Sequence, residues 1–214
     1  YITHPIAVAA QCAEWRLDVQ ALMAALLHDT MEDCGVTKAD LAEQFGHHVA
    51  ELVDGLTKLD KLRFSSRQEN QAESFRKMLL AMANDVRVIL IKLADRSHNM
   101  RTMSDMKRDA QIRIATETIE IYAPIANRFG LDRTFRELEN LSFKFLHPWR
   151  YEVLSKALER ARSRRRHLLQ EVLQNAENAF ASAGLAGRFK AREKTVFSIY
   201  RKMAKKNNNF AQVN

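Results

Sequence analysis

The segment His28-Asp29-Thr30-Met31-Glu32-Asp33 gathers an imidazole and three carboxylates within six residues, directly after an apolar stretch. Helical residues three and four positions apart share a face, so in one continuous helix Glu32 and Asp33 lie one turn beyond Asp29. Carboxylates crowded in this way repel one another unless a cation neutralises them. The segment therefore predicts a metal site with further acid–base groups beside it.

The rest of the chain has the composition and spacing of a helical protein. Only 6 of its 214 residues are glycine and 3 are proline, and apolar residues recur every three to four positions. The β-branched run at 86–91 continues with Leu93 and Ala94, which favours a buried helix over a strand. Helices are expected at 18–33, with Asp18 as its cap, and at 37–45, 48–57, 66–82, 109–122, 132–146 and 149–183.

Charge and texture change along the chain. Residues 1–150 carry 20 Lys and Arg against 21 Asp and Glu, whereas residues 151–214 carry 14 against 5. The pattern alternates over 187–192 as in a strand and then becomes helical. We therefore expect a mostly α protein with a helical domain at 1–148, a helical linker at 149–184 and the beginning of an α/β domain at 185–214.

The sequence also predicts the cellular compartment and whether the chain is part of a longer protein. Cys12 and Cys34 are far apart in a chain with no secretory leader, so we expect no disulfide scaffold and a cytoplasmic protein. No apolar run approaches the roughly 18 residues of a membrane span. The chain opens at Tyr1 without a Met, and we expect it to be part of something longer.

A divalent ion needs more ligands than His28 and Asp29, and two other residues can supply them. His4 lies near the start of its helix, where it can be either a ligand or a helix-start residue. Asp95 follows a strongly apolar run, where a lone buried carboxylate is costly. Two imidazoles and two carboxylates suit Mn²⁺, Fe²⁺ or Zn²⁺.

Further polar residues surround these candidate ligands. A bound ion lowers the pKa of water and polarises a phosphorus–oxygen bond, and Glu32 and Asp33 can then orient the water and pass protons. Asn99 and Thr102 follow Asp95 by four and seven residues, so they share its helical face and offer hydrogen bonds to a substrate. We therefore expect catalysis beside the ion.

The remaining histidines and the basic tail have less specific interpretations. His98 is expected to pack beside the site, and His47, His48 and His147 are expected at the surface or in the core. The arginines at 160–166 are either a solvated helix face or a nucleic-acid contact.

Together these motifs resemble the RelA/SpoT family of bifunctional alarmone enzymes. They include Tyr-Ile-Thr-His-Pro at the start, His-Asp-x-x-Glu-Asp and Lys-Leu-Ala-Asp-Arg followed by His-Asn-Met-Arg-Thr. The supporting stretches are 1–5, 28–33, 53–59, 75–82, 91–96, 98–102 and 120–124. The resemblance covers most of residues 1–150, with Ser97 and Asn127 standing where Leu and His are usual.

The resemblance implies an HD-type helical hydrolase domain that uses Mn²⁺ to remove the 3′-pyrophosphate of (p)ppGpp, giving GDP or GTP. By position, the metal ligands are His4, His28, Asp29 and Asp95, the acidic pair is Glu32 and Asp33, and the nucleotide contacts are Asn99 and Thr102. All of these motifs are intact, so we expect an active hydrolase. Part of the base pocket is expected to precede Tyr1.

The tail resembles the opening of the family's nucleotidyltransferase-like synthetase domain. Its stretches are Arg192-Glu193-Lys194 and Ser198-Ile199-Tyr200-Arg201-Lys202-Met203, and Arg192, Lys194 and Lys202 are the implied contacts to ATP phosphates. The residues that bind Mg²⁺ in that domain are expected beyond Asn214, so the chain as given is not expected to synthesise alarmone. Ribosomal or other regulatory partners are expected only through further regions, and the sequence predicts no particular oligomeric state.

Two alternatives remain open from the residues. One is an HD phosphohydrolase that acts on another phosphorylated nucleotide, because the ligand set does not specify the base. The other is a helical RNA-binding module that relies on the basic tail.

Overall fold

The computed structural model describes residues 2–60, 85–185, 187, 189, 193–206 and 210. All regular secondary structure within these residues is helical, so the mostly α fold class is confirmed. The chain divides into two compact units, Tyr1–Ser142 and Phe143–Asn214. No helix in the described part of the chain is both long and apolar enough to span a bilayer.

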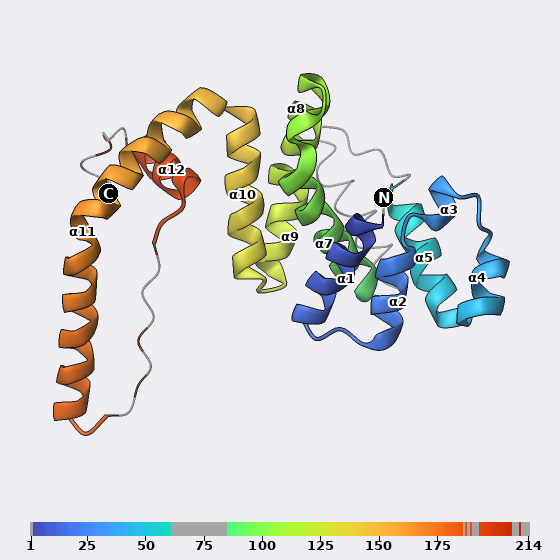
Figure 1. The fold of residues 1–214 in the computed structure, drawn as a ribbon, viewed down its shortest axis with the longest axis horizontal. Coiled ribbons are helices and arrows are strands. Elements are labelled where there is room, and N and C mark those ends of the chain that lie inside the picture. Colours follow the sequence, from blue (N-terminus) through green and yellow to red (C-terminus); the bar gives the residue numbers. More distant parts are fainter. Residues whose placement is uncertain are drawn as a thin grey trace. The chain divides into compact units, whose positions relative to one another are not determined.

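The first unit is a bundle of helices joined mostly by short connections (Figure 1). Its elements are α1 (Thr3–Glu14), α2 (Val19–Leu27), α3 (Thr30–Asp33), α4 (Lys38–Phe45), α5 (His47–Asp60), α7 (Arg87–Thr102), the 3₁₀ turn η1 (Met103–Asp105), α8 (Arg108–Glu117), the π-helical turn η2 (Thr118–Tyr122), α9 (Ala123–Arg128) and α10 (Asp132–Leu146), whose last residues belong to the second unit. The helix predicted at 66–82 lies outside the described residues.

Helix α7 is the most deeply buried helix of this unit. It packs against α1, α2 and α5, and Val88, Ile89, Ile91 and Leu93 are at most 3% exposed. The helix predicted here in place of a strand is confirmed. Because neighbours cover more than one side of α7, its sequence reads as a nearly continuous apolar run without an amphipathic stripe.

The helix predicted to continue from Asp18 to Asp33 is wrong at residues 28–29, where the helix breaks between α2, which ends at Leu27, and α3, which begins at Thr30. Asp18 caps α2 as predicted, accepting a hydrogen bond from the Ala21 amide at 2.9 Å. At the other end, Thr30 Oγ1 donates to the Leu27 carbonyl at 2.6 Å. His28 Nδ1 also bonds a carbonyl of the last turn, and such side-chain bonds compete with continuation of the helix.

The helix predicted at 109–122 has no break after its expected end, because the backbone remains helical through Pro124. The π-helical turn η2 leads directly into α9, and Pro124 occupies the first turn of α9, where its missing N–H costs least. The Arg96 guanidinium from α7 lies 4.2 Å from the centroid of the Tyr122 ring and 3.0 Å from Glu117. This buried cation fastens α7 to the turn.

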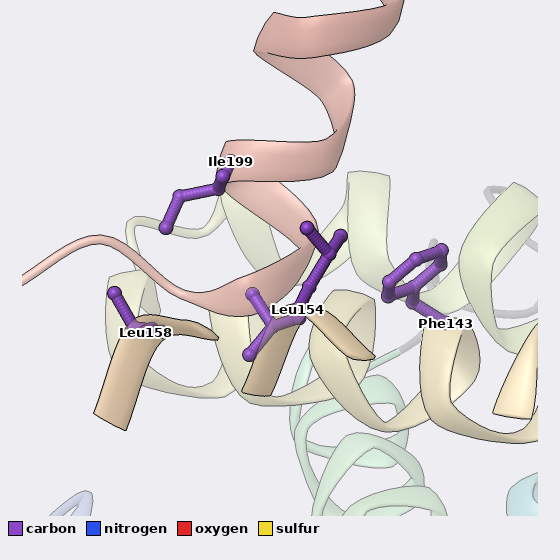
Figure 2. Packing of buried hydrophobic residues seen from close by; sticks show 5 residues of the cluster. Phe143, Leu154, Leu158 and Ile199 are labelled. Atoms are coloured by element: carbon purple, nitrogen blue, oxygen red, sulfur yellow. The ribbon is translucent and has the colours of Figure 1, made fainter. Parts of the chain in front are cut away.

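The second unit contains the end of α10, the long α11 (Pro148–Ser182) and α12 (Val196–Lys206). Its core cluster joins α11 to α12, and Figure 2 shows Leu154 and Leu158 close to Ile199. The Phe143 ring stacks on Tyr200 with centroids 4.5 Å apart. Of the strand expected at 187–192, only residues 187 and 189 are described, and neither lies in a strand.

Gly55 of α5 marks a close approach to α7. A Cβ at this position would lie 2.9 Å from Cγ2 of Val88. Val88 is buried and β-branched, so it cannot turn aside without straining its χ1 angle.

We predict that Gly55→Ala lowers the free energy of unfolding by about 1–2 kcal/mol, because the steric cost exceeds the gain in helix propensity. Urea denaturation measures this difference. In a Val88→Ala background the same change should become neutral or stabilising, since the clashing methyl groups are gone. A Gly55→Ala protein as stable as the wild type contradicts the close packing.

Asp85 and Arg87 tie the start of α7 to the start of α2. Arg87 donates through Nη2 to Asp85 Oδ2 and through Nη1 to Asp18 Oδ2, both at 2.6 Å. The Arg87 backbone N–H also donates to Asp85 Oδ1 at 2.8 Å. The hydrogen bonds from Arg87 hold the pKa of Asp85 below its ordinary value.

We predict that Asp85→Asn destabilises the protein by about 1 kcal/mol at pH 7. The native pKa lies below the unfolded value of about 3.9, so this contribution is complete above that pH and disappears as the pH falls through the native pKa. Urea denaturation of both proteins between pH 7 and pH 3 should show the two curves converging. A difference that does not depend on pH would rule out the charge as its origin.

Candidate metal centre

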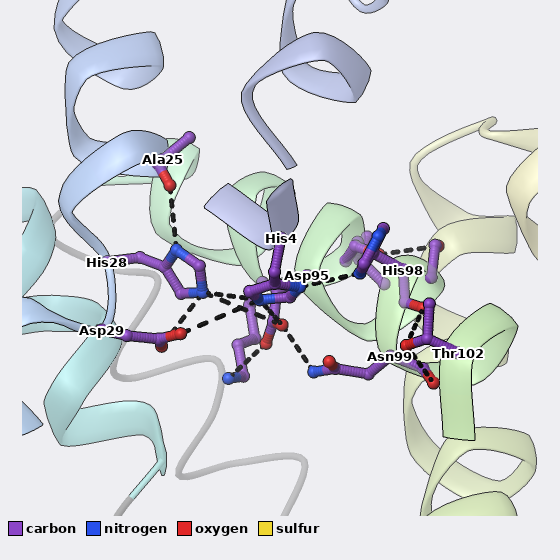
Figure 3. Close-up of polar contacts among 11 residues, drawn as sticks. His4, Ala25, His28, Asp29, Asp95, His98, Asn99 and Thr102 are labelled. Carbon is purple, nitrogen blue, oxygen red and sulfur yellow. Dashed lines mark hydrogen bonds and ion pairs between the residues drawn. The ribbon is translucent and has the colours of Figure 1, made fainter. Parts of the chain in front are cut away.

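Four candidate ligands come together from three parts of the first unit (Figure 3). His4 lies in the first turn of α1, and His28 and Asp29 occupy the break between α2 and α3. Asp95 lies in the middle of α7. The packing of α1 and α2 against α7 brings these parts together, and the fully buried Ala21, Ala24 and Ala25 of α2 allow close approach.

Ligand atoms of His4 and His28 lie close to each other and to those of Asp29 and Asp95. His4 Nε2 lies 3.2 Å from His28 Nε2 and 3.2 Å from Asp95 Oδ1. His28 Nε2 lies 3.0 Å from Asp29 Oδ1 and 3.9 Å from Asp95 Oδ1. His4, His28 and Asp29 form a group whose ligand atoms all lie within 4.8 Å of one another.

These separations suit a divalent ion. Metal–nitrogen and metal–oxygen bonds of about 2.0–2.2 Å place neighbouring ligand atoms roughly 3–4 Å apart. Two imidazole nitrogens and carboxylate oxygens match a divalent transition metal, with no thiolate to favour a softer ion. The donor set and its spacing therefore fit the predicted metal.

Asp95 is a carboxylate that is only 3% exposed. Burial raises its pKa, but the Lys92 ammonium one turn earlier, 2.6 Å from Oδ2, and the hydrogen bond with His4 hold the pKa well below its usual range. Asn99 Nδ2 donates to Oδ1 at 2.6 Å. Asp95 is therefore ionised, as a metal ligand must be.

His28 presents a defined nitrogen to the site. Its Nδ1 lies 2.9 Å from the Ala25 carbonyl, which can only accept, so Nδ1 carries hydrogen and Nε2 faces the other ligands. Burial lowers the pKa of His28, but the hydrogen bond to Asp29 and the charges of Asp95 and Asp29 together raise it by more. The pKa of His28 therefore lies above its ordinary value. A metal ion bound at Nε2 would replace the proton that Nε2 carries when the imidazole is charged.

The acidic pair lies on the turn that follows the candidate ligand Asp29. The backbone N–H groups of Glu32 and Asp33 donate to the Asp29 carbonyl at 3.1 and 2.9 Å, which closes the short helix α3. Both side chains are exposed. The pair is thus held next to the ligands by the backbone.

Asn99 and Thr102 lie on the exposed side of α7, one and two turns beyond Asp95. The Asn99 amide binds Asp95, whereas Thr102 Oγ1 donates to the His98 carbonyl at 3.1 Å. Thr102 therefore bonds its own helix, and only Asn99 reaches a candidate ligand.

The predicted phosphate contacts of the tail belong to the second unit. Lys194 precedes α12 and Lys202 lies on it, and both are exposed. Arg192 lies outside the described residues, as do the side chains of the arginines at 162–166.

Lys92 is a site residue that the sequence interpretation missed. It is only 6% exposed and forms the ion pair with Asp95 described above. A lysine inside an apolar run, three residues before a buried aspartate, is the signal that could have revealed it. His98, expected beside the site, contacts His4 directly, and burial and the charges of His4 and Arg101 lower its pKa.

Comparison with known families agrees with this geometry. The family described as "HD domain" matches residues 1–132, which include all four candidate ligands. The chain therefore belongs to the HD domain family.

Similar curated proteins show which members of the HD domain family this chain resembles. A guanosine-3′,5′-bis(diphosphate) 3′-pyrophosphohydrolase from Haemophilus influenzae is 51% identical over 213 residues, which cover 100% of this chain and 32% of the relative. One with the same name from Vibrio cholerae is 54% identical over 210 residues, covering 98% of this chain and 30% of the relative. The bifunctional (p)ppGpp synthase/hydrolase SpoT of Escherichia coli is 50% identical over 213 residues, covering 100% and 30%. The RelA/SpoT resemblance is confirmed, and the chain spans about a third of the length of these relatives.

We predict that Mn²⁺ raises the melting temperature of the chain and that EDTA reverses the effect, because an ion that binds only the folded state stabilises it. The stabilisation should reach about 3 kcal/mol at 100 times the dissociation constant. His28→Gln should lose the shift, and His47→Gln, on an exposed histidine, should keep it. Equal shifts in both variants would contradict the assignment of His28.

Proposed function

We propose that this chain contains the hydrolase of a metal-dependent enzyme that removes the 3′-pyrophosphate of (p)ppGpp and releases GDP or GTP. One observation carries the proposal. Separations of 3.0–3.9 Å join ligand atoms of His4 and His28 to each other and to those of Asp29 and Asp95. A pair of exposed carboxylates follows on the next turn. This arrangement suits hydrolysis of a phosphate ester.

The names of the relatives support the substrate. Two are 3′-pyrophosphohydrolases of guanosine-3′,5′-bis(diphosphate), and a third is a bifunctional (p)ppGpp synthase/hydrolase. Their identity with this chain, 50–54%, extends over nearly its whole length.

His4, His28, Asp29 and Asp95 would hold the ion. The donor set suits Mn²⁺, Fe²⁺ or Zn²⁺, and we propose Mn²⁺ because the resemblance to the RelA/SpoT family implies it. When bound, the ion lowers the pKa of water and polarises the phosphorus–oxygen bond. Lys92 offsets part of the negative charge around Asp95, so the four ligands and the acidic pair can coexist.

Glu32 and Asp33 are the proposed catalytic residues. As carboxylates they accept hydrogen bonds from the attacking water, and one of them takes its proton. The water oxygen bonds to the phosphorus next to the ribose while the bond from that phosphorus to the 3′-oxygen breaks, and the proton passes to the 3′-oxygen, which becomes the 3′-hydroxyl of GDP or GTP. Their exposure leaves room for a nucleotide to approach the ligands.

Asn99 and Thr102 are the proposed nucleotide contacts. Both lie on the exposed side of α7, and both carry groups that can exchange their present partners for a phosphate or ribose oxygen. An exchange costs little when one hydrogen bond replaces another.

The proposal also covers the domain organisation. Residues 1–148 would form the hydrolase domain, 149–184 the linker and 185–214 the beginning of a synthetase domain, with Mg²⁺ serving the synthetase. A relative named GTP pyrophosphokinase from Myxococcus xanthus, 44% identical over 216 residues and matched along 100% of this chain but 28% of its own length, supports the synthetase assignment. Arg192, Lys194 and Lys202 remain the proposed contacts to ATP phosphates.

We predict that Glu32→Gln and Asp33→Asn each lower the rate of ppGpp hydrolysis by about 10²–10⁴-fold, because each removes a group that accepts a proton. Binding of Mn²⁺ should persist in both, as measured by calorimetry, since neither residue is a ligand. The assay follows release of pyrophosphate from ppGpp, and Glu43→Gln on the exposed side of α4 provides the control.

Parallel assays with dGTP and NADPH test the substrate. Turnover of one of these without release of pyrophosphate from ppGpp would favour another nucleotide phosphohydrolase. RNA binding that survives Asp95→Ala and EDTA, together with absent hydrolysis, would favour the RNA-binding alternative.

A further inference from the structure

The two ring nitrogens of His4 face different surroundings. Nε2 faces the other candidate ligands, while Nδ1 lies 2.8 Å from Nδ1 of His98. Figure 3 shows the His4 ring between His28 and Asp29 on one side and His98 on the other. The rings of His4 and His98 are 4.7 Å apart between centroids and inclined by 58°. This is a direct hydrogen bond between two imidazoles.

Such a bond carries one hydrogen, so the position of that hydrogen determines what Nε2 can do. If His4 Nδ1 donates, the neutral ring has its lone pair on Nε2 and can bind an ion. If His98 Nδ1 donates instead, the neutral His4 ring carries its hydrogen on Nε2, where it blocks the ion. The tautomer of His98 therefore selects the binding state of His4.

His28 shows the contrasting arrangement. Its Nδ1 bonds the Ala25 carbonyl, which can only accept, so the backbone alone determines its tautomer. The partner of His4 can both donate and accept. His98 lies on α7, three residues after Asp95, so one helix supplies both a ligand and the partner of another ligand.

We propose that His98 is the positioning residue for His4: its unprotonated Nδ1 accepts the hydrogen of His4 Nδ1 and keeps His4 Nε2 available to the metal ion. The inference rests on the metal site of the proposed function. His98 is not among the grouped candidate ligands, and its Nδ1 bonds His4 on the side away from His28. Partners of this kind orient metal-binding histidines and raise metal affinity.

The test compares His98→Leu with His98→Asn. Leucine fills similar space without an acceptor, whereas the Asn amide oxygen can accept near the position of Nδ1. We expect the dissociation constant for Mn²⁺, from calorimetry, to rise about 10–100-fold in His98→Leu, and to rise much less in His98→Asn. His47→Leu, on an exposed histidine, should leave it unchanged. Equal affinity in wild type and His98→Leu would overturn the proposal.

Long-range ¹H–¹⁵N spectra of the wild-type imidazoles give a second readout that does not depend on a variant folding. We expect hydrogen on Nδ1 of His4 and on Nε2 of His98 in the protein loaded with Zn²⁺, which is diamagnetic. Hydrogen on Nδ1 of His98 would overturn the proposal.

The outcomes also separate this inference from the proposed function. If the wild-type protein binds Mn²⁺ but releases no pyrophosphate from ppGpp, the proposed function is overturned. The role of His98 is then decided by the Mn²⁺ dissociation constants of the variants and by the positions of the ring hydrogens. Wild type that binds neither Mn²⁺ nor Zn²⁺ overturns both.

Discussion

A carboxylate buried in the middle of a helix is the constraint on which this site depends. Asp95 has lost nearly all contact with water, and its charge is tolerated because Lys92 and the imidazoles of His4 and His28 face it. The imidazoles come from the first turn of α1 and from the end of α2. The negative charge of Asp95 is therefore compensated only when α1, α2 and α7 meet. The alanines of α2 make that meeting possible. The metal centre and the core of the first unit are therefore one arrangement.

The helical fold and the candidate ligands could largely be predicted from composition and from polar residues next to apolar runs. A mostly helical fold followed from the scarcity of glycine and proline, and the burial of α7 from an apolar run too long for one face of a helix. Asp95 stood out because a carboxylate after an apolar run needs a partner, and His28 and Asp29 stood out because carboxylates crowd the same segment. The structure brings His4, His28, Asp29 and Asp95 together.

Features that depend on hydrogen bonds between particular side chains and carbonyls escaped prediction. Residues 21–33 have the propensity of one helix, and only the bonds made by His28 and Thr30 to the preceding turn reveal the break. The contact between His4 and His98 joins residues 94 positions apart, which spacing cannot anticipate. The expected end of a helix at residue 122 was wrong, because a π-helical turn leads directly into α9.

His28 performs two tasks with its two nitrogens. One closes the carbonyl end of α2 through Ala25, and the other faces the metal ligands. A chain that abandoned metal binding by replacing this residue would also leave a buried backbone acceptor without its donor. Because one side chain serves both the end of α2 and the candidate metal site, replacing His28 changes the local order of the helix end together with any binding of an ion.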